Sequence, residues 1–197
     1  MHRTLVGAYL GAETPQGASG FGGSAAEWRD GRSMLLDALD PSRSRIRLLD
    51  HACANGHLVV SLAGWAAQLG VTVDPYGVDI APELIERARD DHPELADRFF
   101  VGDALSWQHP EGERFDLVHL LLDVVTDDLH GLLLRRQLQH VVAPGGRLVV
   151  SQYGAVSPSR SPEAVLRRTG LEVAGLTRPP MRNGRPRGLP SAWVERE

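Results

Sequence analysis

Residues 48–56 read Leu-Leu-Asp-His-Ala-Cys-Ala-Asn-Gly, and they carry the strongest indication of the fold. A short apolar segment leads through an acid into a turn of small residues, and a helical stripe of apolar residues begins after His57. Small side chains let a ligand approach the backbone closely, and the start of a helix favours an anion. The stretch therefore predicts a strand, a ligand-binding turn and a helix in succession.

Strand and helix signals alternate on both sides of this turn. The expected strands cover residues 46–49, 72–78, 99–101, 115–122, 147–153, 171–177 and 192–195. The expected helices cover residues 24–39, 57–69, 83–91, 127–142 and 161–170. This order is typical of a doubly wound α/β fold with a mostly parallel seven-stranded sheet and helices on both faces. The last two strands have no helix between them and should form a C-terminal antiparallel hairpin.

The size and composition of the chain limit its organisation. Its 197 residues suffice for one domain with a sizeable core. We expect residues 1–40 to form a flexible N-terminal segment and a cap helix, and residues 41–197 to form the ligand-binding domain. A formal net charge of -4 gives no broad positive field, so nucleic acid is not an expected partner. Without a recognisable signal peptide or membrane-length apolar run, the expected location is the cytoplasm.

Acidic residues follow three of the expected strands. Asp50, Asp79 and Asp103 each stand at a carboxyl end, which is where ligands bind in such sheets. Oxygen acceptors at Asp79 can hold both hydroxyls of a ribose, and Asp103 can accept from an exocyclic amine such as that of adenine. The three acids together predict a single crevice that accommodates an adenosyl group.

From about Arg45 to Gly154 the chain resembles the class I S-adenosylmethionine-dependent methyltransferase family. The matching segments are LLDHACANG, YGVDIAPELIERAR, FFVGDAL, FDLVHLLL and VVAPGGRLVV. The resemblance implies a Rossmann-like methyltransferase fold, S-adenosyl-L-methionine as cofactor, and transfer of a methyl group to an O, N or C atom. The residues it places at the cofactor are Trp28, Arg32, Asp50, Ala52, Cys53, Ala54, Gly56, Asp79, Ile80, Asp103, Ala104, His119 and Leu120.

The first turn departs from the family pattern Asp-x-Gly-x-Gly-x-Gly. Ala52 and Ala54 stand at two of the glycine positions, and Ala81 replaces a usual serine cap. If the backbone at Ala52 has a positive φ, the alanine costs roughly 1 kcal/mol or more. We expect this departure to affect the affinity for the cofactor and to leave the fold unchanged.

Methyl transfer is an in-line displacement that needs an aligned acceptor and, for some acceptors, removal of a proton. His119 and Asp123, near the end of the fourth strand, are candidate general bases, and Tyr153 is a reserve candidate. The small size of the chain favours a small-molecule acceptor, with residues 1–30 as a lid. The sequence carries no signal for the oligomeric state.

Other functions remain open at this stage. The altered turn is compatible with a non-catalytic protein that binds the cofactor or a related nucleoside and regulates a partner. A nicotinamide enzyme is disfavoured because Gly-x-Gly-x-x-Gly is absent. Cys53 is more simply a turn residue than a nucleophile.

Two groups of charged residues are candidates for metal or anion binding. Asp123, Asp127 and Asp128 can be read as a Mg²⁺ site, but the last two are more simply helix caps, and no metal site is predicted. The basic loop can hold an anionic acceptor or RNA backbone, or can be a solvated loop; its arginines are Arg178, Arg182, Arg185 and Arg187.

Overall fold

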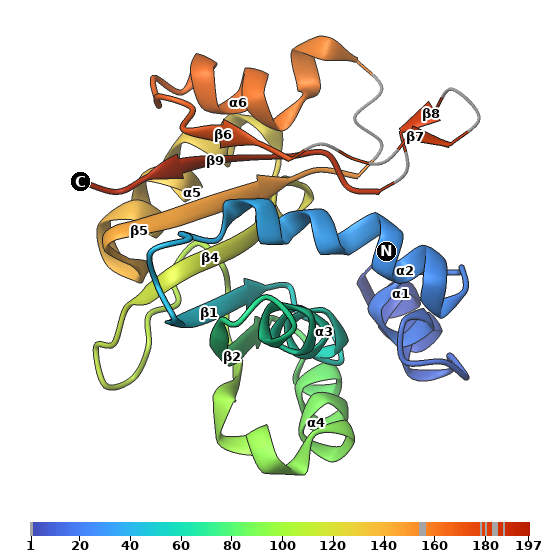
Figure 1. Cartoon of the computed structure of the whole chain (residues 1–197). Helices are drawn as coiled ribbons and strands as arrows, with labels where there is room; N and C mark the ends of the chain where they lie inside the picture. The colour runs from blue at the N-terminus through green and yellow to red at the C-terminus, as the bar shows by residue number, and fades with distance from the viewer. Residues whose placement is uncertain (1, 154–156, 178, 180, 183–184, 187) are drawn as a thin grey trace.

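A seven-stranded sheet forms the centre of the computed structural model, which describes residues 2–153, 157–177, 179, 181–182, 185–186 and 188–197. Its strand order is β3-β2-β1-β4-β5-β9-β6 (Figure 1). The strands are β1 (Arg45–His51), β2 (Thr72–Asp79), β3 (Phe99–Val101), β4 (Phe115–Leu121), β5 (Val142–Ser151), β6 (Gly175–Leu176) and β9 (Ser191–Glu195). β1 to β5 pair in parallel, whereas β9 lies antiparallel between β5 and β6. The predicted doubly wound fold with its C-terminal antiparallel pair is confirmed.

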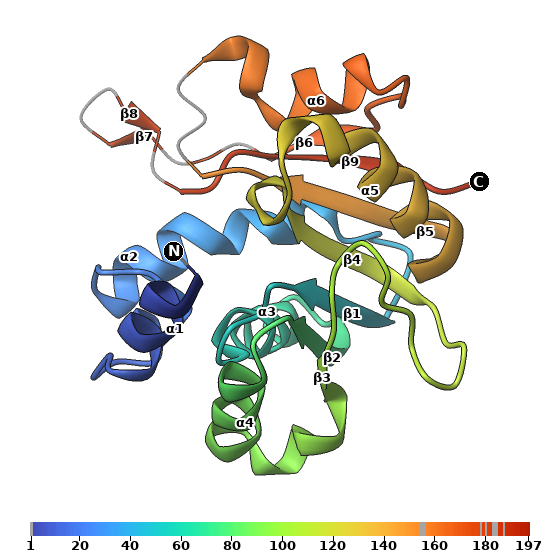
Figure 2. The ribbon, with the colours of Figure 1, turned by 180° about the vertical axis from the view of Figure 1, so that it is seen from behind.

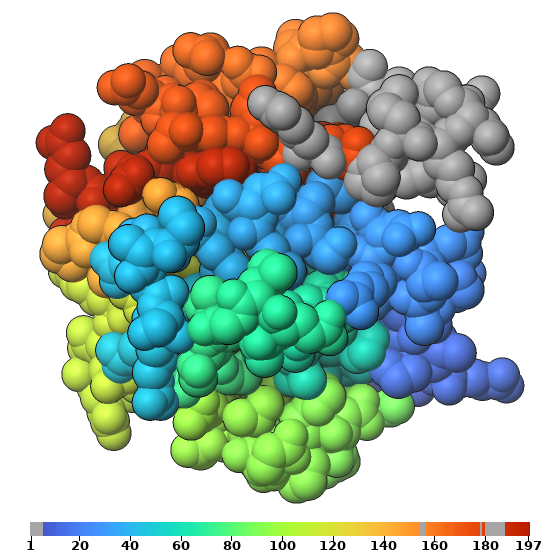
Figure 3. All heavy atoms as spheres, in the orientation of Figure 1, coloured from blue at the N-terminus to red at the C-terminus, as the bar shows by residue number. Residues whose placement is uncertain are grey.

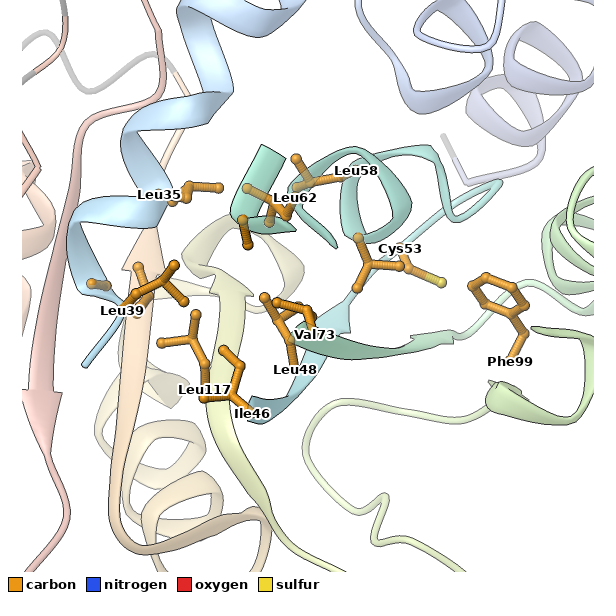
Figure 4. Close-up of a cluster of buried hydrophobic side chains, with 14 of the residues drawn as sticks. Leu35, Leu39, Ile46, Leu48, Cys53, Leu58, Leu62, Val73, Phe99 and Leu117 are labelled. Atoms are coloured by element: carbon orange, nitrogen blue, oxygen red, sulfur yellow. The ribbon is translucent and has the colours of Figure 1, made fainter. Parts of the chain in front are cut away.

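Helices cover both faces of the sheet (Figures 1 and 2). One face carries α2 (Ala25–Arg32), the 3₁₀ helix η2 (Ser33–Ala38), α3 (His57–Ala67) and α4 (Pro82–Asp91). The other carries α5 (His130–Arg136) and α6 (Pro162–Arg168). Figure 4 shows side chains of η2 and α3 meeting Ile46 and Leu48 of β1 in the first core layer. Because strand side chains alternate between faces, Leu49 packs into the second layer.

Several elements differ from the expected ones. The helix expected over residues 24–39 begins with the predicted capping box of Ser24 and Glu27 but continues beyond Arg32 as η2. The helix expected over residues 127–142 is divided into the 3₁₀ helix η5 (Asp127–Leu129), α5 and the π-helix η6 (Gln137–Val141). Between β6 and β9 lies a separate pair, β7 (Met181–Arg182) with β8 (Arg185–Pro186). The predicted basic loop lies partly outside the described residues, which exclude Arg178 and Arg187.

The N-terminal segment, expected to be flexible, contains helix α1 (His2–Leu10) and the 3₁₀ turn η1 (Gly17–Ser19). Val6 and Tyr9 of α1 pack against an apolar cluster of Ala54, Ala81 and Leu84. With only two apolar residues in contact, the segment shows little helical periodicity in the sequence. Packing against the domain nevertheless stabilises the helix.

The N-terminal elements lie at the carboxyl ends of the strands. In Figures 1 and 2 the arrowheads of β1 and β5 point toward the side where α1 and α2 lie. Figure 3 shows the blue N-terminal segment beside the teal surface of α3. Among the described residues, no helix has the length and apolar character needed to cross a membrane.

Candidate functional site

Two adjoining cavities lie at the carboxyl ends of the strands. The larger, of about 590 Å³, is lined by Asp50 and Asp79, together with the predicted residues Trp28, Arg32, Ala52, Cys53, Ala54, Ile80, His119, Asp123 and Tyr153. The smaller, of about 290 Å³, is lined by Asp103 and Ala104. Ala52, Ile80 and Val124 belong to both linings. The three predicted acids are therefore brought to neighbouring surfaces of one region.

The turn after β1 keeps a backbone path suited to glycine although it contains alanines. The φ angles are 60° at Ala52, 50° at Ala54 and 74° at Gly56. Gly56, predicted at the cofactor, does not line either cavity. A Cβ there would lie 2.6 Å from the ring of Phe99. Its role is to let the start of α3 approach that ring. The positive φ considered for Ala52 is thus present.

Asp79 has a fixed orientation at the end of β2. Its Oδ1 accepts a hydrogen bond from the backbone N–H of Ala81 at 2.9 Å, and its Oδ2 accepts one from Ala54 N–H at 3.0 Å. The two backbone donors hold the carboxylate of Asp79 in place beside the turn. The exposed side chain of Ile80 follows Asp79 in the chain. The third acid, Asp103, accepts a hydrogen bond at Oδ1 from the backbone N–H of Leu105 at 2.7 Å.

Asp50 and His119 form a buried pair on neighbouring strands. Asp50 Oδ1 and His119 Nδ1 are 2.7 Å apart, and His119 Nε2 lies 3.0 Å from Ser151 Oγ. Both ring nitrogens of His119 are therefore engaged, although the residue lines the larger cavity. This arrangement makes His119 a partner of Asp50 and leaves no ring nitrogen free toward an acceptor.

Arg32 is a buried cation in an aromatic surround. Its guanidinium lies 5.3, 5.1 and 5.7 Å from the ring centroids of Phe21, Trp28 and Tyr153. It donates to the backbone oxygen of Gly31 at 3.0 Å and to Tyr153 Oη at 3.2 Å. No carboxylate of the described residues forms an ion pair with it. A buried guanidinium that lines a cavity without an acidic partner is suited to an anionic ligand group.

The remaining candidate bases lie at the cavity wall. Asp123 is exposed, and its Oδ2 accepts from the backbone N–H of Tyr153 at 2.7 Å. Tyr153 is 46% exposed. Tyr9, which the sequence did not suggest, also lines the larger cavity, and burial, reinforced by Tyr153 and Asp79, raises the pKa of its phenol.

The alternation of side chains along β4 decides which of its residues line the cavity. Leu120 is fully buried in the core, and Leu121 lines the cavity in its place. The two-residue period of β4 places His119 and Leu121 on the same face of the strand, and the sequence contained this signal.

Burial, reinforced by Asp50 and Asp79, raises the pKa of the Cys53 thiol well above its usual range. No group of three metal-ligating side chains occurs within the described part of the chain.

Comparisons with solved structures agree with the fold. The chain is 22% identical to a Pseudomonas syringae protein classed as a methyltransferase, with a TM-score of 0.57, covering 88% of this chain and 100% of that one. A magnesium protoporphyrin IX methyltransferase from Synechocystis, with bound S-adenosylmethionine, is 17% identical at TM-score 0.60, with coverage of 100% and 92%. An O-methyltransferase family 2 protein from Planctomyces limnophilus, in complex with apigenin, is 15% identical at TM-score 0.59, with coverage of 88% and 58%.

Sequence comparisons give the family. No curated protein sequence matches the chain. A family model described as a methyltransferase domain matches residues 48–146, which is half of the chain. This match agrees with the predicted methyltransferase family and gives no support to the non-catalytic alternative. The chain belongs to the methyltransferase domain family.

Proposed function

We propose that the protein transfers the methyl group of S-adenosylmethionine to an O, N or C atom of a small molecule bound in the larger cavity. The observation that carries the proposal is the set of charges around the two cavities. Asp50, Asp79 and Asp103 supply carboxylates, and Arg32 supplies a cation that has no ion-pair partner among the described carboxylates. S-adenosylmethionine carries two ribose hydroxyls, an exocyclic amine, an ammonium and a carboxylate, so the groups present fit it.

Each carboxylate has a proposed counterpart. Asp103 and Ala104 line the smaller cavity, which suits the adenine, with Ile80 against its ring. Asp79 lies nearer the turn and suits the ribose. Asp50 and Arg32, in the larger cavity, suit the ammonium and the carboxylate of the methionine part. When bound, the cofactor supplies an electrophilic methyl group on its sulfonium.

The residues of the chain then have to align the acceptor and remove a proton. Asp123 is the proposed general base, because its carboxylate is held at the cavity by Tyr153 N–H and both nitrogens of His119 are engaged. Val6 and Tyr9 of α1 lie over the same cavity, so residues 1–40 are proposed to cap the domain of residues 41–197 and exclude water. A cavity of about 590 Å³ is of a size for small ligands.

A small-molecule acceptor has support from the lining. Tyr153, Leu121 and Leu189 give the larger cavity aromatic and aliphatic walls beside the polar group of Asp123. Such walls with few polar groups are typical of sites for compact organic molecules. The neighbour from Planctomyces limnophilus, solved in complex with apigenin, has the same fold.

The first test is calorimetry with S-adenosylmethionine and S-adenosylhomocysteine, followed by a labelled-methyl screen on small-molecule extracts. Asp79→Asn should weaken binding at least tenfold. Asp74→Asn is a matched control, because Asp74 lies on the same strand and pairs with Arg45 away from both cavities. Absence of binding would refute the proposal, and binding without any transfer would favour a regulatory protein.

The second test concerns the base. Once an acceptor is found, Asp123→Asn should lower the rate of methyl transfer by about 10²–10⁴-fold, as loss of a general base does. Its affinity for S-adenosylhomocysteine should stay within about twofold of the parent. An unchanged rate would mean that positioning alone carries the reaction.

A further inference from the structure

The N-terminal segment is bonded to the turn after β1 through one buried side chain. Asn55 belongs to this turn, is 1% exposed and lines neither cavity. Its Oδ1 accepts hydrogen bonds from Ser19 Oγ at 2.6 Å and from the backbone N–H of His57 at 3.3 Å. Its Nδ2 donates to the backbone oxygen of Pro15 at 3.1 Å. A single amide therefore joins the N-terminal segment to the first turn of α3.

The domain holds this amide in one orientation. Asp91, at the end of α4, has its Oδ2 3.4 Å from Asn55 Nδ2, while its Oδ1 accepts from Arg87 Nε at 2.8 Å. The amide nitrogen thus faces two acceptors, and the amide oxygen faces two donors. Turning the amide over would set its nitrogen against the His57 N–H and its oxygen against the Asp91 carboxylate. Asn55 is therefore a fixed point to which the N-terminal segment is attached.

The attached segment holds Tyr9 of α1. Gly20 directly follows Ser19, and a Cβ at Gly20 would lie 2.5 Å from Tyr9 Oη. The phenol therefore packs against the backbone of Gly20, at a distance that no larger residue would permit. Ser19 and Tyr9 both line the larger cavity. The hydrogen bonds of Asn55 thus fix the backbone on which a cavity-lining phenol rests.

Tyr9 stands between two parts of the proposed site. Burial raises the pKa of its phenol, and Tyr153 and Asp79 reinforce this effect, so both groups lie within electrostatic reach of it. Asp79 is proposed to bind the ribose, whereas Tyr153 forms part of the wall proposed for the acceptor. The phenol keeps its proton at neutral pH and can donate or accept a hydrogen bond. Its position suits contact with a ligand at the junction of the two parts.

We propose that Tyr9 is a further ligand-binding residue, and that Asn55 positions it through the backbone of residues 19–20, so that the turn and the N-terminal segment retain the cofactor together. The inference rests on the proposed function, because it takes the larger cavity as the cofactor site. It adds that a residue outside the cavity controls how long the cofactor stays. A bound ligand leaves only after the segment above it has opened, so these bonds act mainly on the rate of dissociation.

Other contacts limit how far the segment opens when one of these bonds is lost. Tyr9 and Val6 also pack against an apolar cluster of the domain. Trp28 Nε1 donates to Ser61 Oγ at 3.2 Å, which joins α2 to α3. Removal of the Ser19 hydroxyl should therefore loosen the segment and leave it folded. One hydrogen bond between neutral groups accounts for a change of about threefold to tenfold in a rate or an affinity.

The test measures the dissociation of S-adenosylhomocysteine by rapid dilution, with tryptophan fluorescence as the signal. Ser19→Ala should dissociate about threefold to tenfold faster than the parent, whereas Ser19→Thr, which keeps the hydroxyl, should stay within about twofold of it. Ser42→Ala is the matched control, because Ser42 Oγ also donates to one side chain, Asp40, at 2.7 Å, but outside both cavities. Its dissociation rate should equal that of the parent.

Double variants show whether the hydrogen bonds act through the phenol. Tyr9→Ala should accelerate dissociation at least as much as Ser19→Ala does. In the Tyr9→Ala background, Ser19→Ala and Asn55→Ala should each change the rate by less than about twofold, because the group that they position is gone. A purely structural role would instead multiply the effects of the paired substitutions. Multiplied effects, or an unchanged rate in Ser19→Ala and Tyr9→Ala, would overturn the inference and leave the proposed function standing. Failure of the parent to bind S-adenosylhomocysteine would overturn both.

Discussion

Replacing Ala52 with glycine should make the protein more stable. The backbone at Ala52 has a φ of 60°, in the left-handed region that costs a non-glycine residue about 1–2 kcal/mol. Glycine removes this cost but gains freedom in the unfolded chain, worth about 0.4–1 kcal/mol. The Ala52 methyl group is only half-buried and lines the cavities, so little packing is lost. The balance predicts a gain of about 0.5–1 kcal/mol for Ala52→Gly.

Ala54→Gly is the matched control. Ala54 has a similar φ of 50°, but it is only 5% exposed and its methyl packs in the cluster with Ala81 and Leu84. Loss of a buried methyl group costs about 0.8 kcal/mol, before any cavity cost. The relief of strain and the loss of packing should nearly cancel, so Ala54→Gly should leave stability unchanged or lower it.

Urea unfolding followed by circular dichroism measures both variants. A gain of 0.5–1 kcal/mol in Ala52→Gly corresponds to a rise in Tm of about 1–4 °C for a chain of this length. The informative quantity is the difference between the two glycine variants, about 1 kcal/mol. If Ala52→Gly is destabilised as much as Ala54→Gly, the left-handed backbone carries no strain and the reasoning is refuted.

Three further predictions follow from the site and its surroundings. Arg32→Met should weaken S-adenosylhomocysteine binding about 10–100-fold by calorimetry, because one charge-assisted bond is lost; an unchanged affinity would remove Arg32 from the site. Gly56→Ala should destabilise by about 3 kcal/mol in urea, since its Cβ would meet Phe99 at 2.6 Å and its φ is 74°; Phe99→Leu in the same chain should restore part of the loss. The pKa of His51 is lowered by burial from 6.5 to about 4, so between these values the unfolded chain binds a proton that the folded one does not. The free energy of unfolding should therefore decrease as the pH is lowered from 6.5 to about 4, by up to about 3 kcal/mol. His51→Leu should show a shallower pH dependence in urea titrations at pH 4.5–6.5.

The sequence predicted those elements whose signals are local. An acid after each of three strands and a turn of small residues located Asp50, Asp79 and Asp103, and the structure brings them to adjoining cavities. The capping box at Ser24 and Glu27 located the start of α2. In each case the residues that produce the local structure lie within one short segment, so the segment alone predicts it.

Contacts between distant segments could not be predicted in the same way. Tyr9 reaches the cavity because α1 packs on α4, which depends on two apolar residues in a segment with little periodicity. Ser151 and Ser191 complete the hydrogen-bond chain of His119 because β9 enters the sheet beside β5. No single segment carries these pairings, since the sheet register creates them.

The same register explains why the altered turn keeps its path. Cys53 N–H donates to Val78 O at 3.1 Å, and Ala54 N–H donates to Asp79 Oδ2 at 3.0 Å, so β2 holds the turn from the side. Strained backbone persists where surrounding bonds over-determine it. Asp79 therefore has two roles, because the carboxylate proposed to bind ribose also holds the left-handed turn, which is proposed to lie beneath the methionine part. It follows that alanine at position 52 adds strain without changing the geometry of the turn, and that relief of this strain should appear as stability.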